Sequence, residues 1–154
     1  AHIFHPHMVE PLALQLKDLR SKCVKLACTV ISEAARTLGP SFRESAVDLM
    51  PTLVRVLRVT VTVITEAADG CIQQLLANVR TSLLLPPIVQ GMSAKDSVPL
   101  LRCRCAQYVE TVLQTFSAAN VEEEITEIES GIVKALADAA ADVRTAARSA
   151  FVAL

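Results

Sequence analysis

The feature that most constrains this chain is a set of apolar positions that recurs about every 41 residues, four times over. Within each copy the apolar residues are spaced by four, three and four positions, which places them on one face of an α-helix. The sequence therefore predicts the same helix face four times. The aligned positions are Cys23, Ile64, Cys105 and Ala147; Ala27, Ala68, Val109 and Phe151; Val30, Cys71, Val112 and Leu154; and Ala34, Leu75 and Phe116.

A second apolar helix is expected before each copy of this face. Two-helix units of roughly 40 to 47 residues are typical of HEAT and armadillo repeats, which stack because one helix pair cannot bury its apolar face alone. Armadillo units usually add a third helix and a glycine-rich break, so a chain with 4 glycines favours HEAT. We predict an all-α fold, an α-solenoid of about four HEAT-type helix pairs. The earlier helices are expected at 8–16, 45–57, 83–92 and 121–137.

The repeats fill residues 8–154, which we expect to form one HEAT-repeat domain. Residues 1–7 precede the first repeat and are interpreted as a tail or a cloning remnant. Gly39 is expected to end one helix, and Ser41 followed by Glu44 has the spacing of a capping box for the next.

Composition narrows the functional classes. A chain with 52% hydrophobic residues does not remain disordered, and a formal net charge of -1 gives no global attraction to nucleic acid or to an acidic membrane. The longest uncharged stretch, 81–94, is too short to cross a bilayer and contains Pro86 and Pro87. We therefore expect a buried helix there, in a soluble protein.

The chain has 5 cysteines, an odd number, placed within apolar helical patterns. A domain of this size needs no disulfide for stability, so the pattern indicates reduced thiols in a cytosolic compartment. We predict that Cys23, Cys71 and Cys105 are buried and unpaired.

Signatures of catalysis and of metal binding are weak. The chain has no glycine-rich phosphate loop and no G-x-S-x-G motif, so we expect neither enzyme activity nor a cofactor. One alternative is a metal cluster that combines His2, His5 and His7 with Cys103 and Cys105. Two residues two positions apart on a helix point to different sides, however, and we therefore expect no metal site.

Positive side chains gather near the turns expected within each helix pair, and we expect these four turns to line up along one edge. Such an edge suits an acidic protein surface, whereas the absence of aromatic residues from the turns disfavours nucleic acid. A structural alternative stays open, in which Arg20 and Arg144 pair with turn carboxylates such as Asp18 and Asp142. The cations are Lys17, Arg20, Lys22 and Lys25 at the first turn; Arg55 and Arg58 at the second; Lys95, Arg102 and Arg104 at the third; and Arg144 and Arg148 at the fourth.

Together these residues resemble the TOG domain of the microtubule-associated CLASP family. The resemblance extends from about Gln15 to Phe151, and its central block is most similar to plant-type members. The residues that carry it are Lys17-Asp18-Leu19-Arg20-Ser21, Leu38-Gly39, Phe42, Ala46, Met50-Pro51-Thr52-Leu53, Val59 through Ile64, Glu66 through Asp69, Cys71, Ile72, Asn78, Leu101-Arg102-Cys103-Arg104-Cys105, and Asp138 to Arg148.

The resemblance implies a flat HEAT paddle that contacts tubulin through its intra-repeat turns. The parent protein would be found in the cytoplasm on the cytoskeleton, where it would stabilise microtubules and promote their regrowth. The tubulin-binding residues it implies are Lys17 and Arg20 in the first turn, Arg58 and Thr60 in the second, Lys95 and Arg102 in the third, and Arg144 and Arg148 in the fourth.

One departure from the family concerns the first repeat. TOG domains usually begin with a further HEAT pair whose turn presents an aromatic residue, often Trp, and this chain contains no Trp. The chain looks like a domain truncated at its N-terminal side, so we expect an exposed apolar face at Leu12, Leu14 and Leu16 that supports self-association. The alternative function is a HEAT scaffold that binds another regulatory protein or a peptide.

Overall fold

The computed structural model describes residues 4–95 and 98–154, and helices make up 84% of it, without a strand in these two ranges. The chain divides into two compact units, Ala1–Thr81 and Ser82–Leu154, which we call the first and the second unit. No helix in the described part of the chain combines the length and the apolar character that a bilayer span requires.

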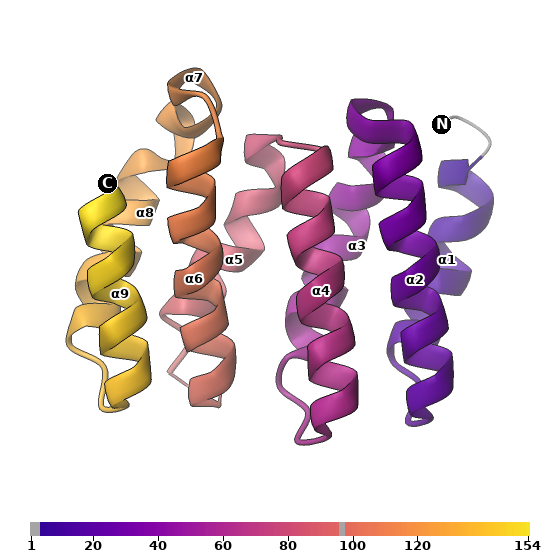
Figure 1. Cartoon of the computed structure of the whole chain (residues 1–154), viewed down its shortest axis with the longest axis horizontal. Helices are drawn as coiled ribbons and strands as arrows, with labels where there is room; N and C mark the ends of the chain where they lie inside the picture. The colour runs from indigo at the N-terminus through magenta and orange to yellow at the C-terminus, as the bar shows by residue number, and fades with distance from the viewer. Residues whose placement is uncertain (1–3, 96–97) are drawn as a thin grey trace. The chain divides into compact units, whose positions relative to one another are not determined.

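The first unit consists of two helix pairs. The helices within each pair contact one another, α1 with α2 and α3 with α4. Like helices also stack, since α1 packs on α3 and α2 packs on α4 (Figure 1). Its elements are α1 (Phe4–Leu16), α2 (Ser21–Leu38), the 3₁₀ helix η1 (Gly39–Phe42), α3 (Arg43–Val56) and α4 (Thr62–Asn78).

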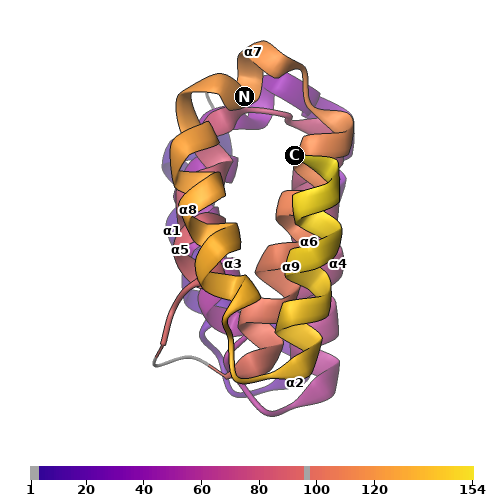
Figure 2. The same cartoon turned by 90° about the vertical axis from the view of Figure 1, so that its left-hand side faces the viewer.

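The second unit repeats this arrangement. The pairs are α5 with α6 and α8 with α9, and α5 packs on α8 while α6 packs on α9 (Figure 2). Four helix pairs that stack in this way, two in each unit, confirm the predicted all-α, HEAT-type fold. The elements of this unit are η2 (Ser82–Leu84), α5 (Leu85–Met92), α6 (Pro99–Thr115), α7 (Ala118–Val121), η3 (Glu122–Glu124), α8 (Ile125–Leu136) and α9 (Ala141–Ala153).

Each of the four earlier helices begins at a residue other than the one expected: α3, α5 and α8 span 43–56, 85–92 and 125–136 in place of 45–57, 83–92 and 121–137. Helix α1 begins at Phe4, earlier than residue 8, and the His5 imidazole lies 2.8 Å from the Asp48 carboxylate of α3. Gly39 ends α2 with φ 52°, a conformation that suits glycine. The prediction of a capping box at Ser41 is wrong. Ser41 lies within η1, and no side chain caps the N-terminus of α3.

The repeat register is accurate in the central helices and shifted at the outer ones. Helix α2 turns Val24, Ala27 and Ile31 to its neighbours and leaves Cys23 half-buried, so the predicted burial of Cys23 is wrong. In α9 the buried side is made by Val143, Ala146, Ala147 and Ala150, whereas Phe151 and Leu154 are exposed. Cys71 and Cys105 are buried, and all five cysteines are unpaired thiols, as predicted.

The prediction of an exposed apolar face on α1 is also wrong. Leu12 and Leu16 are buried, because α1 packs against both α2 and α3, and only Leu14 is largely exposed, at 63%. The three leucines therefore do not form a continuous surface for self-association.

Candidate functional site

The two intra-repeat turns of the first unit lie together at one end of its helices. The first turn is formed by 17–20 and the second by 57–61, and both line one hollow of about 270 Å³. We call this the turn-edge hollow. It is lined by Leu16, Lys17, Asp18, Leu19, Thr52, Arg55, Val56, Val59, Val61 and Ile64.

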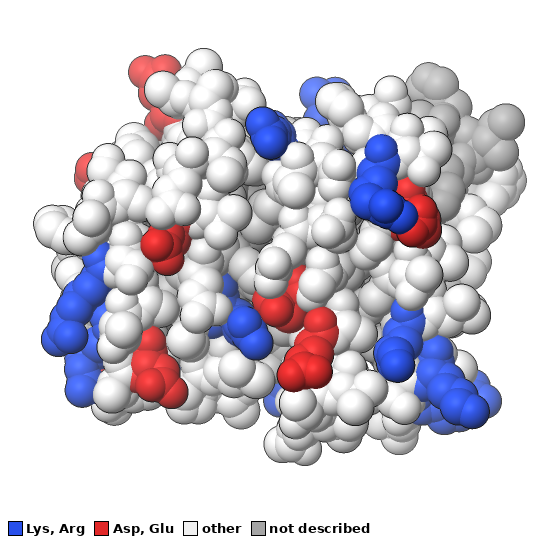
Figure 3. Space-filling model, in the orientation of Figure 1, with Lys and Arg blue, Asp and Glu red and all other residues white. Residues whose placement is uncertain are grey.

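The rim of the turn-edge hollow combines exposed aliphatic side chains with cations. Leu19 is 95% exposed and Val61 is 48% exposed, although both are apolar. Lys17 and Arg55 are exposed and line the hollow, and Arg58 is exposed in the second turn. Figure 3 shows Lys and Arg atoms gathered over this end of α2. Exposed apolar groups that border a cationic rim are typical of surfaces that bind a protein partner.

Asp18 and Arg20 form a local pair within the first turn. The Arg20 backbone N–H donates to Asp18 Oδ1 at 2.8 Å, and the guanidinium donates to both carboxylate oxygens at 3.1 and 2.9 Å. These bonds from Arg20 lower the pKa of Asp18 to about 2. The Arg20 side chain is nevertheless 78% exposed, so its pairing with Asp18 leaves it accessible to a partner.

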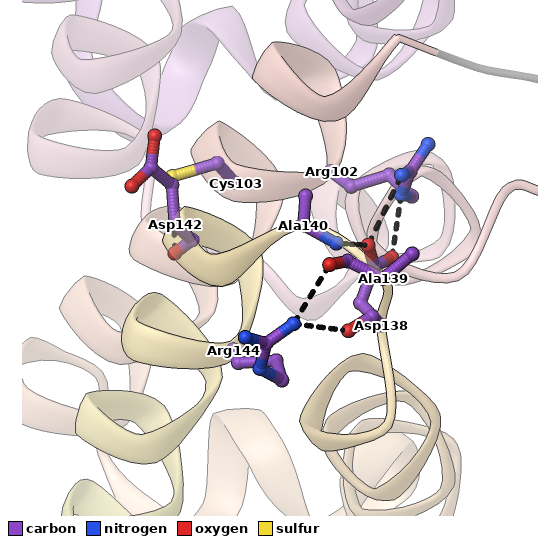
Figure 4. A network of polar contacts seen from close by, with 7 residues as sticks. All are labelled: Arg102, Cys103, Asp138, Ala139, Ala140, Asp142 and Arg144. Atoms are coloured by element: carbon purple, nitrogen blue, oxygen red, sulfur yellow. Dashed lines mark hydrogen bonds and ion pairs between the residues drawn. The ribbon is translucent and has the colours of Figure 1, made fainter.

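The turns of the second unit are joined by an ion pair between two repeats. Arg102, in the first turn of α6, donates from Nε to Asp138 Oδ2 at 2.6 Å and from Nη2 to Asp138 Oδ1 at 3.1 Å (Figure 4). The two side chains are only 11% and 12% exposed. The hydrogen bonds from Arg102 are the main reason that the pKa of Asp138 lies below its usual value.

Arg144 is held by the same turn. Its Nη1 donates to the carbonyl oxygens of Asp138 and Ala139, each at 2.8 Å, and the backbone N–H of Ala140 donates to Asp138 Oδ1 at 2.8 Å. We call Arg102, Asp138, Ala139, Ala140 and Arg144 the Asp138 network. Its bonds fix the turn before α9 to the start of α6.

Asp138 was not predicted as an ion-pair partner. Asp142 was expected to pair with Arg144, but Arg144 donates to the carbonyl oxygens of Asp138 and Ala139. The position of this aspartate relative to the next helix could have identified it. Asp18 and Asp138 each lie two residues before the N-cap residue of a helix, Arg20 of α2 or Ala140 of α9. Each carboxylate accepts the N–H of that capping residue at 2.8 Å.

The remaining predicted site residues fall into different settings. Thr60 is exposed in the second turn, and Lys95 is exposed in the turn that follows α5. Arg148 is exposed in the middle of α9, not at a turn. His2, one of the residues weighed for a metal site, lies outside the described residues.

The residues considered for a metal site are dispersed. His5 contacts Asp48, Cys105 is buried on α6, and Cys103 is half-buried on another side of that helix. Burial raises the pKa of Cys105 to about 12. Among the described residues, no group of three or more His, Cys, Asp or Glu side chains is arranged to hold a metal ion.

Comparisons with known proteins relate this arrangement to one family. Residues 2–154 match the family described as CLASP N terminal. A CLIP-associated protein of Arabidopsis thaliana is 35% identical over 146 residues, which are 94% of this chain and 10% of that protein. CLIP-associating protein 1 of Xenopus tropicalis is 25% identical over 138 residues, which are 90% of this chain and 9% of that protein. The chain spans about a tenth of the length of these curated relatives.

Proposed function

Because the chain belongs to the family of CLASP N-terminal domains, we propose that it is a microtubule-associated module that binds tubulin through its intra-repeat turns. In the parent protein this binding would help to stabilise microtubules and promote their regrowth. The module would act in the cytoplasm, on the cytoskeleton.

The observation that carries this proposal is the rim of the turn-edge hollow. Leu19 and Val61 expose apolar surface, and the exposed cations Lys17 and Arg55 line the hollow beside it. Arg58 adds a further exposed positive charge in the second turn. Apolar contacts that exclude water supply affinity, and cations at the rim attract an acidic protein surface and set its orientation. A turn edge with both features suits an acidic protein partner such as tubulin.

The proposed contact residues differ in their roles. Five of them are exposed, and we assign these to direct contact with tubulin: Lys17, Arg20, Arg58 and Thr60 in the first unit and Lys95 in the second. Arg102 and Arg144 hold the turn before α9 through the Asp138 network, so they act by positioning that turn. Arg148 lies on the helix face of α9, and we assign it a secondary, electrostatic role.

The turn-edge hollow also gives specific support to the alternative function. A hollow of about 270 Å³ with aliphatic walls has room for an apolar side chain of a peptide. A HEAT scaffold for another regulatory protein would use this hollow as a pocket for one anchoring side chain. The two functions differ in their dependence on the rim cations. Binding to acidic tubulin requires these cations, whereas binding of an apolar side chain in the hollow does not.

The proposal is tested by co-sedimentation with microtubules and by gel filtration with free tubulin. The variant Lys17→Glu/Arg58→Glu reverses one exposed charge in each of the two turns, and we expect it to weaken binding about tenfold, since each such charge contributes up to about 1 kcal/mol. Added salt should weaken the parent more than the variant.

The matched control is Arg43→Glu. Arg43 is exposed in the same unit but begins α3, at the opposite end of the helices from the turns. We expect this variant to bind as the parent does. Equal binding by the double variant, with its melting temperature unchanged, would move the tubulin contact away from this edge and favour the scaffold function.

A further inference from the structure

Two cysteines of neighbouring repeats face each other in the first unit. Cys28 lies on α2 and Cys71 on α4, two helices that pack directly against one another. Both side chains are buried, with 4% and 1% exposure, yet both line one hollow of about 430 Å³. Exposed Lys25 and Glu33 line the same hollow, so it opens to solvent.

The Cys71 side chain faces one side of α2. Cys28 and Ser32, four residues apart on that helix, line the same hollow as Cys71. Small residues allow the helices to approach, since Ala27 and Ala68 are fully buried between them. The two thiols are therefore adjacent across a close helix contact, although 42 residues separate them in the chain.

The two thiols differ in acidity. The hydrogen bond with Cys71 lowers the pKa of Cys28, and this effect opposes that of burial. The same bond, together with burial, raises the pKa of Cys71 well above its usual value. Cys28 is also the more exposed of the two thiols, at 4% against 1%, and we assign it the thiolate, which is the form that reacts with oxidants.

We propose that Cys28 and Cys71 are a modification site, a dithiol that a peroxide oxidises to a disulfide between the first two repeats. The Cys28 thiolate attacks one oxygen of hydrogen peroxide, the O–O bond breaks, and Cys28 becomes a sulfenic acid while hydroxide leaves. The Cys71 sulfur then attacks the Cys28 sulfur, the S–O bond breaks, and the departing hydroxide takes the Cys71 proton to form water. Overall, two thiols lose two electrons and two protons, and one peroxide becomes two molecules of water.

The other cysteines lack this combination of features. Cys105 is buried on α6 with a pKa raised to about 12 by burial. Cys103 is half-buried, and its sulfur contacts the Asp142 carbonyl. Cys103 is the one cysteine among the residues that line its hollow, and Cys105 is fully enclosed in the core. Cys103 therefore serves as the matched control position.

A disulfide at this site would tie α2 to α4 and thus link the two repeats covalently. It would close a chain loop of 42 intervening residues, which restricts the unfolded chain and raises the melting temperature. This proposal does not depend on tubulin binding.

The test is a peptide map of the whole chain after treatment with hydrogen peroxide, with free thiols alkylated before trypsin digestion. Trypsin places Cys28 in peptide 26–36 and Cys71 in peptide 59–80. We expect the two peptides to appear joined, two hydrogen atoms lighter than their sum, and to separate on reduction with dithiothreitol. The melting temperature of the oxidised protein should exceed that of the reduced protein.

Two variants define the site. Cys71→Ala should abolish the joined peptide and the increase in melting temperature, whereas Cys103→Ala should leave both unchanged. Because the map of the unmutated protein is itself decisive, a folding defect in Cys71→Ala does not remove the test. Peroxide that converts Cys28 to sulfinic acid, or leaves it reduced while Cys103 is oxidised, without any joined peptide, would overturn the proposal.

Discussion

The two units use the ends of their helices differently. In the second unit, Arg102 and Arg144 hold the turn before α9 through the Asp138 network. In the first unit, the corresponding region is the turn-edge hollow, and the cations on its rim point to solvent. The same architecture thus produces one turn edge closed by arginines and another left open around an apolar hollow.

A single position in the repeat accounts for much of this difference. Arg102 and Arg144 each stand four residues after the residue that caps their helix, Val98 or Ala140. In the repeat register, the equivalent residues of the first unit are Arg20 and Val61. Arg20 donates to Asp18 of its own turn, and Val61 has no guanidinium, so the described part of the first unit has no corresponding arginine bridge between its two turns. A positive charge near a turn is therefore evidence for a binding surface only after its position in the repeat has been considered.

The largest effect on stability is expected from removing the carboxylate at the centre of the Asp138 network. Asp138→Ala removes both charged hydrogen bonds to Arg102 and should lower the free energy of unfolding by about 1.5–3 kcal/mol. Asp18→Ala, the matched change in the first unit, should lower the melting temperature much less, because Asp18 pairs only within its own turn. Thermal unfolding of both variants measures the difference, and equal losses would remove the distinction between the two edges.

The Asp138 network should also make stability depend on pH. The pKa of Asp138 is lower in the folded chain than in the unfolded chain, so the ion pair stabilises the fold fully above pH of about 4. This stabilisation is lost as the pH falls through the folded-state pKa. Urea unfolding should therefore show a large difference between the parent and Asp138→Asn at pH 7 and a smaller one near pH 3. A difference that stays constant over this range would contradict the role given to the ionised carboxylate.

Two glycines provide a smaller contrast in packing. Gly70, on α4 of the first unit, has open space where a Cβ would lie, so Gly70→Ala should stabilise the helix by about 0.5–1 kcal/mol. Gly131, on α8 of the second unit, is buried, and an added Cβ would collide with the Met92 side chain. Gly131→Ala should therefore stabilise less than Gly70→Ala, because the terminal methyl of the buried Met92 side chain must move to make room. Chemical denaturation of the two variants measures this difference, and a larger gain at Gly131 would contradict it.

The smallest effect on stability is expected at the rim of the turn-edge hollow. Lys17 and Arg58 are exposed, so Lys17→Glu/Arg58→Glu should leave the melting temperature within experimental error. Arg102→Glu should lower it clearly, because the new carboxylate would face Asp138. A marked loss of stability in the first variant would mean that its cations, too, are structural.

Much of the fold could be predicted from the sequence because helix pairing depends on local periodicity. The repeat register predicted four helix pairs. The second turn was expected around Arg58, and the structure has it at 57–61. The exposure of Leu12 and Leu16 was predicted wrongly, since burial depends on how α1 packs against α3 and not on the spacing within α1.

The candidate site could be predicted only in part. The cations of the turns are visible in the sequence, but the partner of Arg102 is 36 residues away, at Asp138. No local pattern indicates whether an arginine will reach across to the next repeat. The turn-edge hollow was also missed, because it is formed by aliphatic residues from two separate turns.

The central claim is that the open turn edge of the first unit is the surface that binds tubulin. Backbone amide hydrogen exchange, measured with and without tubulin, tests this claim most directly. Peptides that cover 17–20 and 57–61 should exchange more slowly in the complex, because the partner would shield their backbone N–H groups. The opposite end of the same unit, Gly39–Phe42, should exchange at an unchanged rate. Protection at Gly39–Phe42 with none at the two turns would contradict the claim.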